Sequence, residues 1–146
     1  MIAQTIQLAL APVFVLVAIG NLIATLTQRL GRVVDRSREL QQLHSTTEGM
    51  EHDMVVREIR TLDHRIALIG RALLLLVLAG LAIGVTVMLL FVEEFAHAGL
   101  NPVAAGTFIC AIGLLMAALL TFLRETREAT AALRIPESYL EKGRKL

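Results

Sequence analysis

The amino-acid sequence predicts an all-α membrane protein with three transmembrane helices and a cytosolic antiparallel helical hairpin between spans one and two. Hydrophobic residues make up 55% of the 146 residues, above the share of about 45–50% that is usual for soluble domains. Charged residues are absent from three long apolar runs and crowd between and after them. Heptad patterns of apolar residues also leave the first run and approach the second, which is typical of paired helices.

The first predicted transmembrane helix occupies residues 1–28. No ionisable side chain occurs from Ile6 to Leu26, and about 20 residues that rise roughly 1.5 Å each cover a hydrocarbon core of roughly 30 Å. Residues 1–5 lack the basic segment of a cleaved signal peptide, so we interpret the run as an uncleaved anchor. Some of its residues recur at alternating steps of four and three and therefore share one helix face. They are Gln7, Ala11, Phe14, Ala18, Asn21, Thr25 and Gln28.

Residues 29–71 are predicted to form the cytosolic hairpin, with a turn where Ser, Thr, Gly and Asp residues gather around residues 44–53. Heptad seams precede and follow this turn. The outgoing seam is Leu26, Leu30, Val33, Ser37, Leu40 and His44, and the returning seam is Val55, Ile59, Leu62, Ile66, Ile69 and Leu73. Two facing seams imply an antiparallel helix pair, although heptad spacing leaves open whether the pair forms within or between subunits.

Residues 72–92 and 102–123 are predicted to be transmembrane helices two and three, because neither run contains a charged residue. The external loop between them, residues 93–101, contains Gly99 and Asn101, which break helices, and Pro102 fits the first turn of the next helix. Residues 124–146 form the predicted cytosolic tail, where helix can continue until Pro136 interrupts it.

The positions of the basic residues predict the orientation. Of the 14 Lys and Arg residues, eight lie in residues 29–71 and six in residues 124–146. Basic residues favour the cytoplasmic side of a membrane. The N-terminus and residues 93–101 are therefore expected outside, and the hairpin and the C-terminus inside.

The polar face of the first span has two interpretations. Asn21 lies deep in the span, and an unsatisfied amide in hydrocarbon is costly, so this face is expected to contact protein or water. It either packs against another helix through small and polar residues, or it lines a hydrated pathway with Phe14 as the constriction. Three spans cannot easily enclose a pathway, so the second interpretation requires a homo-oligomer. The face continues as an expected cytosolic vestibule formed by Arg32, Asp35 and Glu39.

Further charged residues lie at the predicted membrane borders. Glu93 and Glu94 are candidates for an external pore mouth that concentrates cations, and the alternative is that they only end the span. The basic residues at the cytosolic border are expected to contact anionic lipid. They are Arg29, Arg65, Arg71, Arg124 and Arg127. Small residues in the later spans, including the GxxxG pair Gly80 and Gly84, pack helices within or between subunits.

The sequence offers no support for catalysis, because it lacks a Ser-His-Asp order, a Gly-rich phosphate loop and paired intramembrane carboxylates. We expect no enzyme, no cofactor, no metal site and no nucleic-acid partner. The expected partners are membrane lipids, further copies of the chain and inorganic ions, with any protein partner unknown. A homo-oligomeric ion-conducting pore is the first functional hypothesis. The alternative is a non-conducting scaffold or regulatory subunit whose hairpin docks a partner.

Two runs in the first helix carry a family resemblance. The residues LAPVF at 10–14 and RLGRVVDRSR at 29–38 resemble the opening of a bacterial membrane family known as domain of unknown function 2721. The resemblance covers most of the chain and implies a multi-span protein of the bacterial inner membrane. It implies no substrate and no catalytic motif.

Overall fold

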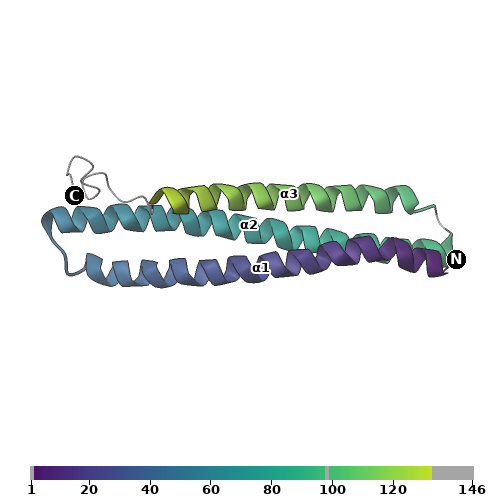
Figure 1. Cartoon of the computed structure of the whole chain (residues 1–146), viewed down its shortest axis with the longest axis horizontal. Helices are drawn as coiled ribbons and strands as arrows, with labels where there is room; N and C mark the ends of the chain where they lie inside the picture. The colour runs from purple at the N-terminus through teal and green to yellow at the C-terminus, as the bar shows by residue number, and fades with distance from the viewer. Residues whose placement is uncertain (1, 98, 133–146) are drawn as a thin grey trace, which may run out of the picture.

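The computed structural model describes residues 2–97 and 99–132 of the chain. It contains three long helices, α1 (Ile2–His44), α2 (Gly49–Ala96) and α3 (Asn101–Ala132). Their long axes run in roughly the same direction, and the chain reverses direction at each connection (Figure 1). The all-α prediction is confirmed for these residues. Residues 133–146 of the predicted cytosolic tail, including Pro136, lie outside the described residues.

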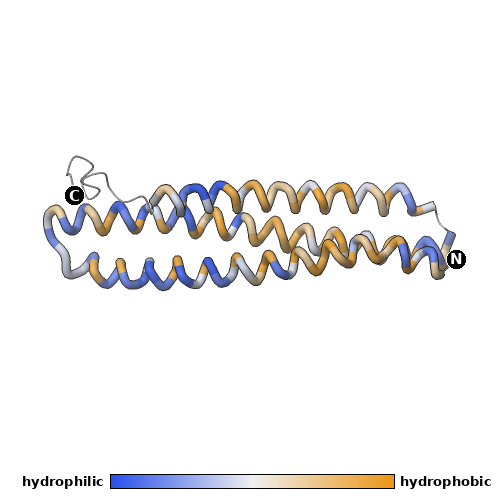
Figure 2. Tube along the Cα trace, viewed as in Figure 1, coloured by the Kyte–Doolittle hydropathy of each residue, from blue (hydrophilic) through white to orange (hydrophobic). Residues whose placement is uncertain are grey.

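Each of the three helices is long and apolar enough to cross a membrane. Figure 2 shows that hydropathy differs between the two ends of the bundle. Apolar residues dominate the part toward the N-terminus, and polar residues gather around the connection between α1 and α2. The chain is therefore a multi-pass membrane protein with three candidate spans. We refer to residues 29–71 and 124–132 as the polar end, and to residues 2–12, 86–97 and 99–108 as the N-terminal end.

The helices continue well beyond the thickness of a bilayer. Helix α1 has 43 residues and is therefore roughly 65 Å long, against a hydrocarbon core of roughly 30 Å. A connection at residues 45–48 joins it to α2, which has 48 residues. The extra length of both helices forms most of the polar end.

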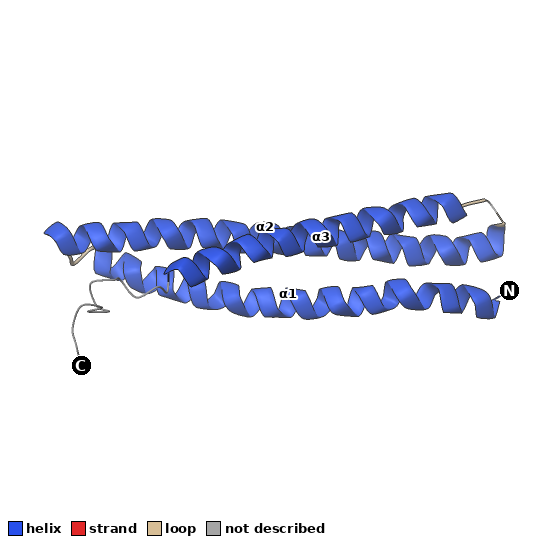
Figure 3. Ribbon diagram, turned by 45° about the horizontal axis from the view of Figure 1, so that its top comes forward, coloured by secondary structure: helices blue, strands red, loops and turns tan. Residues whose placement is uncertain are grey.

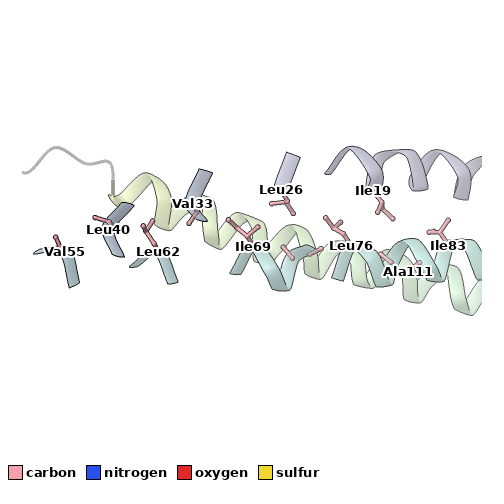
Figure 4. Close-up of a cluster of buried hydrophobic side chains, with 13 residues drawn as sticks. Ile19, Leu26, Val33, Leu40, Val55, Leu62, Ile69, Leu76, Ile83 and Ala111 are labelled. Atoms are coloured by element: carbon pink, nitrogen blue, oxygen red, sulfur yellow. The ribbon is translucent and has the colours of Figure 1, made fainter. Parts of the chain in front are cut away.

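A heptad core holds the bundle together (Figure 4). In α1 the buried series is Ile19, Leu26, Val33 and Leu40, and in α2 it is Val55, Leu62, Ile69, Leu76 and Ile83. These residues belong to one hydrophobic cluster, as knobs-into-holes packing of heptads requires. The α1 and α2 seams that the sequence predicts therefore meet within a single chain.

Helix α2 is the central element, because it packs along both α1 and α3, whereas α1 and α3 contact each other only weakly. The buried series of α3 includes the small residues Ala104, Ala111 and Ala118, which allow the α3 backbone to approach α2 closely. Gly80 of α2 fills the same role toward α1: a Cβ built there would lie 3.6 Å from the Leu16 side chain. Gly84, the other member of the GxxxG pair, has no neighbour within 4 Å of such a Cβ.

A tight turn connects α2 to α3. His97 ends α2 with φ of 50°, and Gly99 follows with φ of 71°, a left-handed conformation that glycine adopts without steric cost. The His97 N–H donates to the Glu93 carbonyl oxygen at 2.9 Å. Pro102 lies in the first turn of α3, where its missing N–H leaves no hydrogen bond unmade.

Candidate functional site

The predicted polar stripe of α1 lies on the surface of the chain. All seven of its residues are exposed, and they are Gln7, Ala11, Phe14, Ala18, Asn21, Thr25 and Gln28. Helix α1 instead uses Ile19 and Leu26 to pack on α2. The stripe is therefore not a packing seam between helices of one subunit.

The polar groups of the stripe differ in how they are satisfied. The Thr25 hydroxyl donates to the Asn21 carbonyl oxygen at 3.0 Å, so it is paired within its own helix. Among the residues that the structure describes, the side-chain amides of Asn21 and Gln7 make no hydrogen bond. An amide in an apolar span needs a partner from water or from another helix. The side-chain amides of the stripe therefore need hydrogen-bond partners from outside the described chain, such as water or a helix of another subunit.

The most buried charge in the described chain is Glu125 of α3, whose side chain is 0% exposed. It lies one heptad after Ala118, so it occupies a core position at the point where the apolar span ends. Arg29 from α1 and Arg65 from α2 reach it with side chains that are 25% and 18% exposed. We call these three residues the ion cluster.

The two arginines contact different oxygens of the carboxylate. Arg65 donates from Nε at 3.2 Å and from Nη2 at 3.0 Å to Glu125 Oε1. Arg29 Nη2 lies 2.8 Å from Oε2, an ion pair that lacks the alignment of a hydrogen bond. The Arg29 guanidinium also lies 5.1 Å from the centre of the Phe122 ring, within the range of a cation–π contact.

The ion cluster joins all three helices at one point. Its Arg29–Glu125 pair connects α1 to α3, which otherwise pack little against each other. Removal of one partner from a buried ion pair typically costs about 3–5 kcal/mol, because the remaining charge is left without compensation. Two guanidinium groups face one carboxylate, so the cluster carries a net charge of +1.

The cluster changes the interpretation of the basic border residues. Arg29 and Arg65, which the sequence suggests as lipid contacts, are directed to Glu125 instead, whereas Arg71, Arg124 and Arg127 are exposed. Sequence reasoning did not single out Glu125. The available signal was its seven-residue step from the series that contains Ala111 and Ala118.

The predicted vestibule residues Arg32, Asp35 and Glu39 are all exposed at the polar end. Close to them, Arg36 donates from Nε to Glu58 Oε1 at 2.9 Å and from Nη1 to Glu39 Oε2 at 3.1 Å. Hydrogen bonds to Glu58 and then Glu39 raise the pKa of Arg36 above its usual value. The pair with Glu58 links α1 to α2 across the polar end.

The connection between α1 and α2 brings two histidines together, with the ring centres of His44 and His52 4.4 Å apart. Across residues 2–97 and 99–132, no group of three or more His, Cys, Asp or Glu side chains is placed to hold a metal ion.

The predicted external mouth residues, Glu93 and Glu94, are half-buried at the N-terminal end. The Thr5 hydroxyl donates to Glu94 Oε2 at 2.7 Å and so links α1 to α2. Glu93 Oε2 accepts a hydrogen bond of 2.6 Å from the Leu100 N–H, which holds the turn before α3. Both carboxylates therefore have structural partners, and they line a polar hollow of about 320 Å³.

A family model described as "Protein of unknown function (DUF2721)" matches residues 9–135. The chain belongs to the DUF2721 family. The match covers parts of all three helices and includes every residue of the ion cluster. It confirms the resemblance predicted from the first helix. Neither curated proteins nor solved structures include a significant match to the chain.

Proposed function

We propose that this DUF2721 protein is a homo-oligomeric membrane protein in which the α1 stripe faces a central axis and lines an ion-conducting pore. The observation that carries the proposal is the exposure of the whole stripe, including the Asn21 and Gln7 amides, on a single chain. A ring of copies supplies the partners that lipid cannot, either as hydrogen-bonding neighbours or as enclosed water.

The proposed residue roles follow the length of α1. Gln7, Asn21 and Thr25 provide the polar lining. Phe14, with 70% of its surface exposed, forms the apolar constriction. Arg32, Asp35 and Glu39 line the vestibule at the polar end, and Glu93 and Glu94 contribute negative charge at the opposite mouth.

We further propose that the protein lies in a bacterial inner membrane with its N-terminus outside and its C-terminus inside. The polar end is then the cytosolic hairpin. The distribution of Lys and Arg supports this orientation, because none occurs before residue 29 or between residues 72 and 123.

The proposal is tested by ion flux into liposomes that contain the purified protein, with potassium, sodium and chloride measured separately. We expect flux of one charge sign, and we expect Asn21→Leu to change its rate while the oligomer keeps its size. Absence of flux at all tested voltages and pH values contradicts the pore. A variant that loses the oligomer assigns the stripe to packing instead.

Two threonines provide a matched control. Thr25 and Thr27 are both exposed, and each hydroxyl donates to the carbonyl oxygen four residues earlier, at 3.0 Å and 2.8 Å. Only Thr25 belongs to the stripe. Thr25→Val is therefore expected to change flux, and Thr27→Val to leave it unaltered. Equal effects of the two variants count against the assignment of the lining face.

A second candidate function is a scaffold whose polar end docks a protein partner. The observation that favours it is the exposure of Met50 and Met54, at 83% and 68%, beside the α1–α2 connection. Methionine is common on surfaces that adapt to a partner. A photo-crosslinker at position 50 in intact cells is expected to join one defined polypeptide if docking occurs. Labelling of lipid or of no polypeptide removes this candidate.

A further inference from the structure

Helix α2 continues past the last described residue of α3 at the polar end of the bundle (Figure 3). His64 of α2 lies 3.3 Å from Glu128 of α3, and the two helices run in opposite directions (Figure 1). Ala132, where the described part of α3 ends, is one helical turn beyond Glu128 and therefore lies beside about residue 60 of α2. The described part of α3 thus leaves residues 49–59 of α2 uncovered.

The uncovered part of α2 presents two exposed methionines. Met50 and Met54 are 83% and 68% exposed. Met50 lies two heptads before His64, whose side chain contacts α3, and residues that share a heptad position lie along one side of a packed helix. Met54 follows Met50 by one helical turn and shares its face. The two methionines therefore extend the α3-facing side of α2 beyond α3, and methionine packs against apolar groups of varied shape.

Acidic residues flank the two methionines. Residues 48–58 contain the acidic residues Glu48, Glu51, Asp53 and Glu58 and one basic residue, Arg57. Glu58 pairs with Arg36 of α1, whereas the other three carboxylates form no ion pair with the described part of the chain. An apolar pair between carboxylates is complementary to a segment that combines apolar and basic residues.

Residues 133–146 of the same chain have this composition. They lie outside the described residues, and their sequence is LRIPESYLEKGRKL, with four basic and two acidic side chains. The levels of residues 60 and 50 of α2 are about 15 Å apart, and a chain of 14 residues spans up to about 46 Å. A segment joined to its site by a short connection is present there at an effective concentration on the order of millimolar.

We propose that residues 133–146 dock on the side of α2 that carries the two exposed methionines. The apolar residues of the segment pack against the methionines, and its Lys and Arg side chains pair with the carboxylates of Glu48, Glu51 and Asp53. The proposal rests on neither the pore nor the scaffold, because the contact lies within one chain. Docking covers the surface that the scaffold function offers to a protein partner, so the segment competes with that partner.

The proposal is tested by photo-crosslinking in the full-length protein, purified and reconstituted in nanodiscs of phosphatidylcholine and phosphatidylglycerol. Benzoylphenylalanine takes the place of Tyr139, an aromatic residue of the segment. Peptide mass spectrometry is expected to find position 139 joined to residues 49–58, in a product that keeps the mass of one chain on a denaturing gel. A product with the mass of two chains assigns the site to a second copy and overturns the proposal. Crosslinks only to lipid, or to other parts of the chain, also overturn it.

Charge reversal addresses the ion pairs. Lys142→Glu with Lys145→Glu is expected to lower the yield of the crosslink about tenfold, because two attractions become repulsions. Glu51→Lys with Asp53→Lys is expected to lower it equally. The protein with all four changes should recover the original yield. A yield that stays low in this protein overturns the pairing of these charges.

The methionines are addressed separately. Met54→Ala is expected to lower the yield about fourfold, an effect equivalent to the burial of one methylene group. Met88→Ala is the matched control, since Met88 is a methionine with 57% exposure in the candidate span of α2, and it should leave the yield unchanged. Circular dichroism verifies that each variant keeps its helix content. A yield that is the same in Met54→Ala and in the unmodified protein overturns docking on this side of α2.

Discussion

At the polar end all three helices meet at Glu125, whereas at the N-terminal end a cleft separates α1 from α3. The first junction is a buried carboxylate with two arginines. The second includes the hydrogen bonds that Glu94 accepts from the Thr5 hydroxyl and Glu93 from the Leu100 N–H, and the hydrogen bond between the Thr86 and Thr107 hydroxyls. The difference shows that an ion pair joins α1 directly to α3 at the polar end, whereas the Thr5–Glu94 hydrogen bond joins α1 to α2 at the N-terminal end. The two ends are therefore expected to respond very differently to substitution.

The largest effect is expected for Glu125→Leu. The change leaves Arg29 and Arg65 without their shared counter-charge, and we expect it to lower the free energy of unfolding by about 3 kcal/mol, because both arginines are partly exposed. Unfolding in mixed micelles of mild detergent and dodecyl sulfate, followed by circular dichroism, measures it. Glu128→Leu is the control, since Glu128 is an exposed residue of the same helix with an ion pair to His64 at 3.3 Å. Similar losses in both variants would contradict a special role for the cluster.

The next effect concerns the position of α1 rather than its stability alone. Arg29→Leu removes both the ion pair to Glu125 and the contact with the Phe122 ring, so we expect α1 and α3 to separate at the polar end. Spin labels at the exposed positions 27 and 123, read by pulsed electron resonance, are expected to give a longer and broader distance distribution. The exposed Arg124, replaced by Leu, should leave that distribution as it is.

A smaller effect is expected at the other end of the bundle. Thr5→Val removes the hydrogen bond to Glu94, and we expect a loss of about 1 kcal/mol in the free energy of unfolding. Thr130→Val is the control, because Thr130 is exposed and bonds only within α3 in the described residues. A loss as large as that of Glu125→Leu would remove the contrast between the two ends.

The smallest effect is expected for the exposed pair at the polar end. Arg36→Ala removes hydrogen bonds to Glu58 and Glu39, whose side chains, like that of Arg36, are about half exposed. Exposed ion pairs typically contribute about 0–1 kcal/mol and are screened by salt. We therefore expect a change in unfolding free energy below about 0.5 kcal/mol, which shrinks further at 1 M salt.

The sequence was sufficient to predict the features that depend on local spacing along one helix. Charge-free runs predicted the helices that form the candidate spans, and the heptads at Val33, Leu40, Val55 and Leu62 predicted the seam between α1 and α2. Both signals depend only on spacing along one helix. The same periodicity predicted that the residues of the stripe, Asn21 among them, share one face of α1. It did not predict that this face is exposed, because small and polar residues on one face fit helix packing equally well.

The ion cluster and the cleft could not be derived in this way. Glu125 pairs with Arg65, 60 positions away, and nothing in local spacing selects that partner from the other border arginines. The α3 core consists of alanines at positions 104, 111 and 118, which do not stand out from an apolar span. The cleft depends on how far α1 and α3 separate around α2, and this is a property of packing rather than of either helix.

The central claim, that the α1 stripe lines an ion pathway, is tested most directly by chemical access to Asn21. In a Cys110→Ser background, which removes the chain's single, exposed cysteine, Asn21→Cys and Thr27→Cys are reconstituted into liposomes and treated with a charged, membrane-impermeant thiol reagent. We predict that the reagent changes ion flux through Asn21→Cys and leaves Thr27→Cys unaffected. A reagent with no effect on flux at either position, or with the same effect at both, would contradict the account.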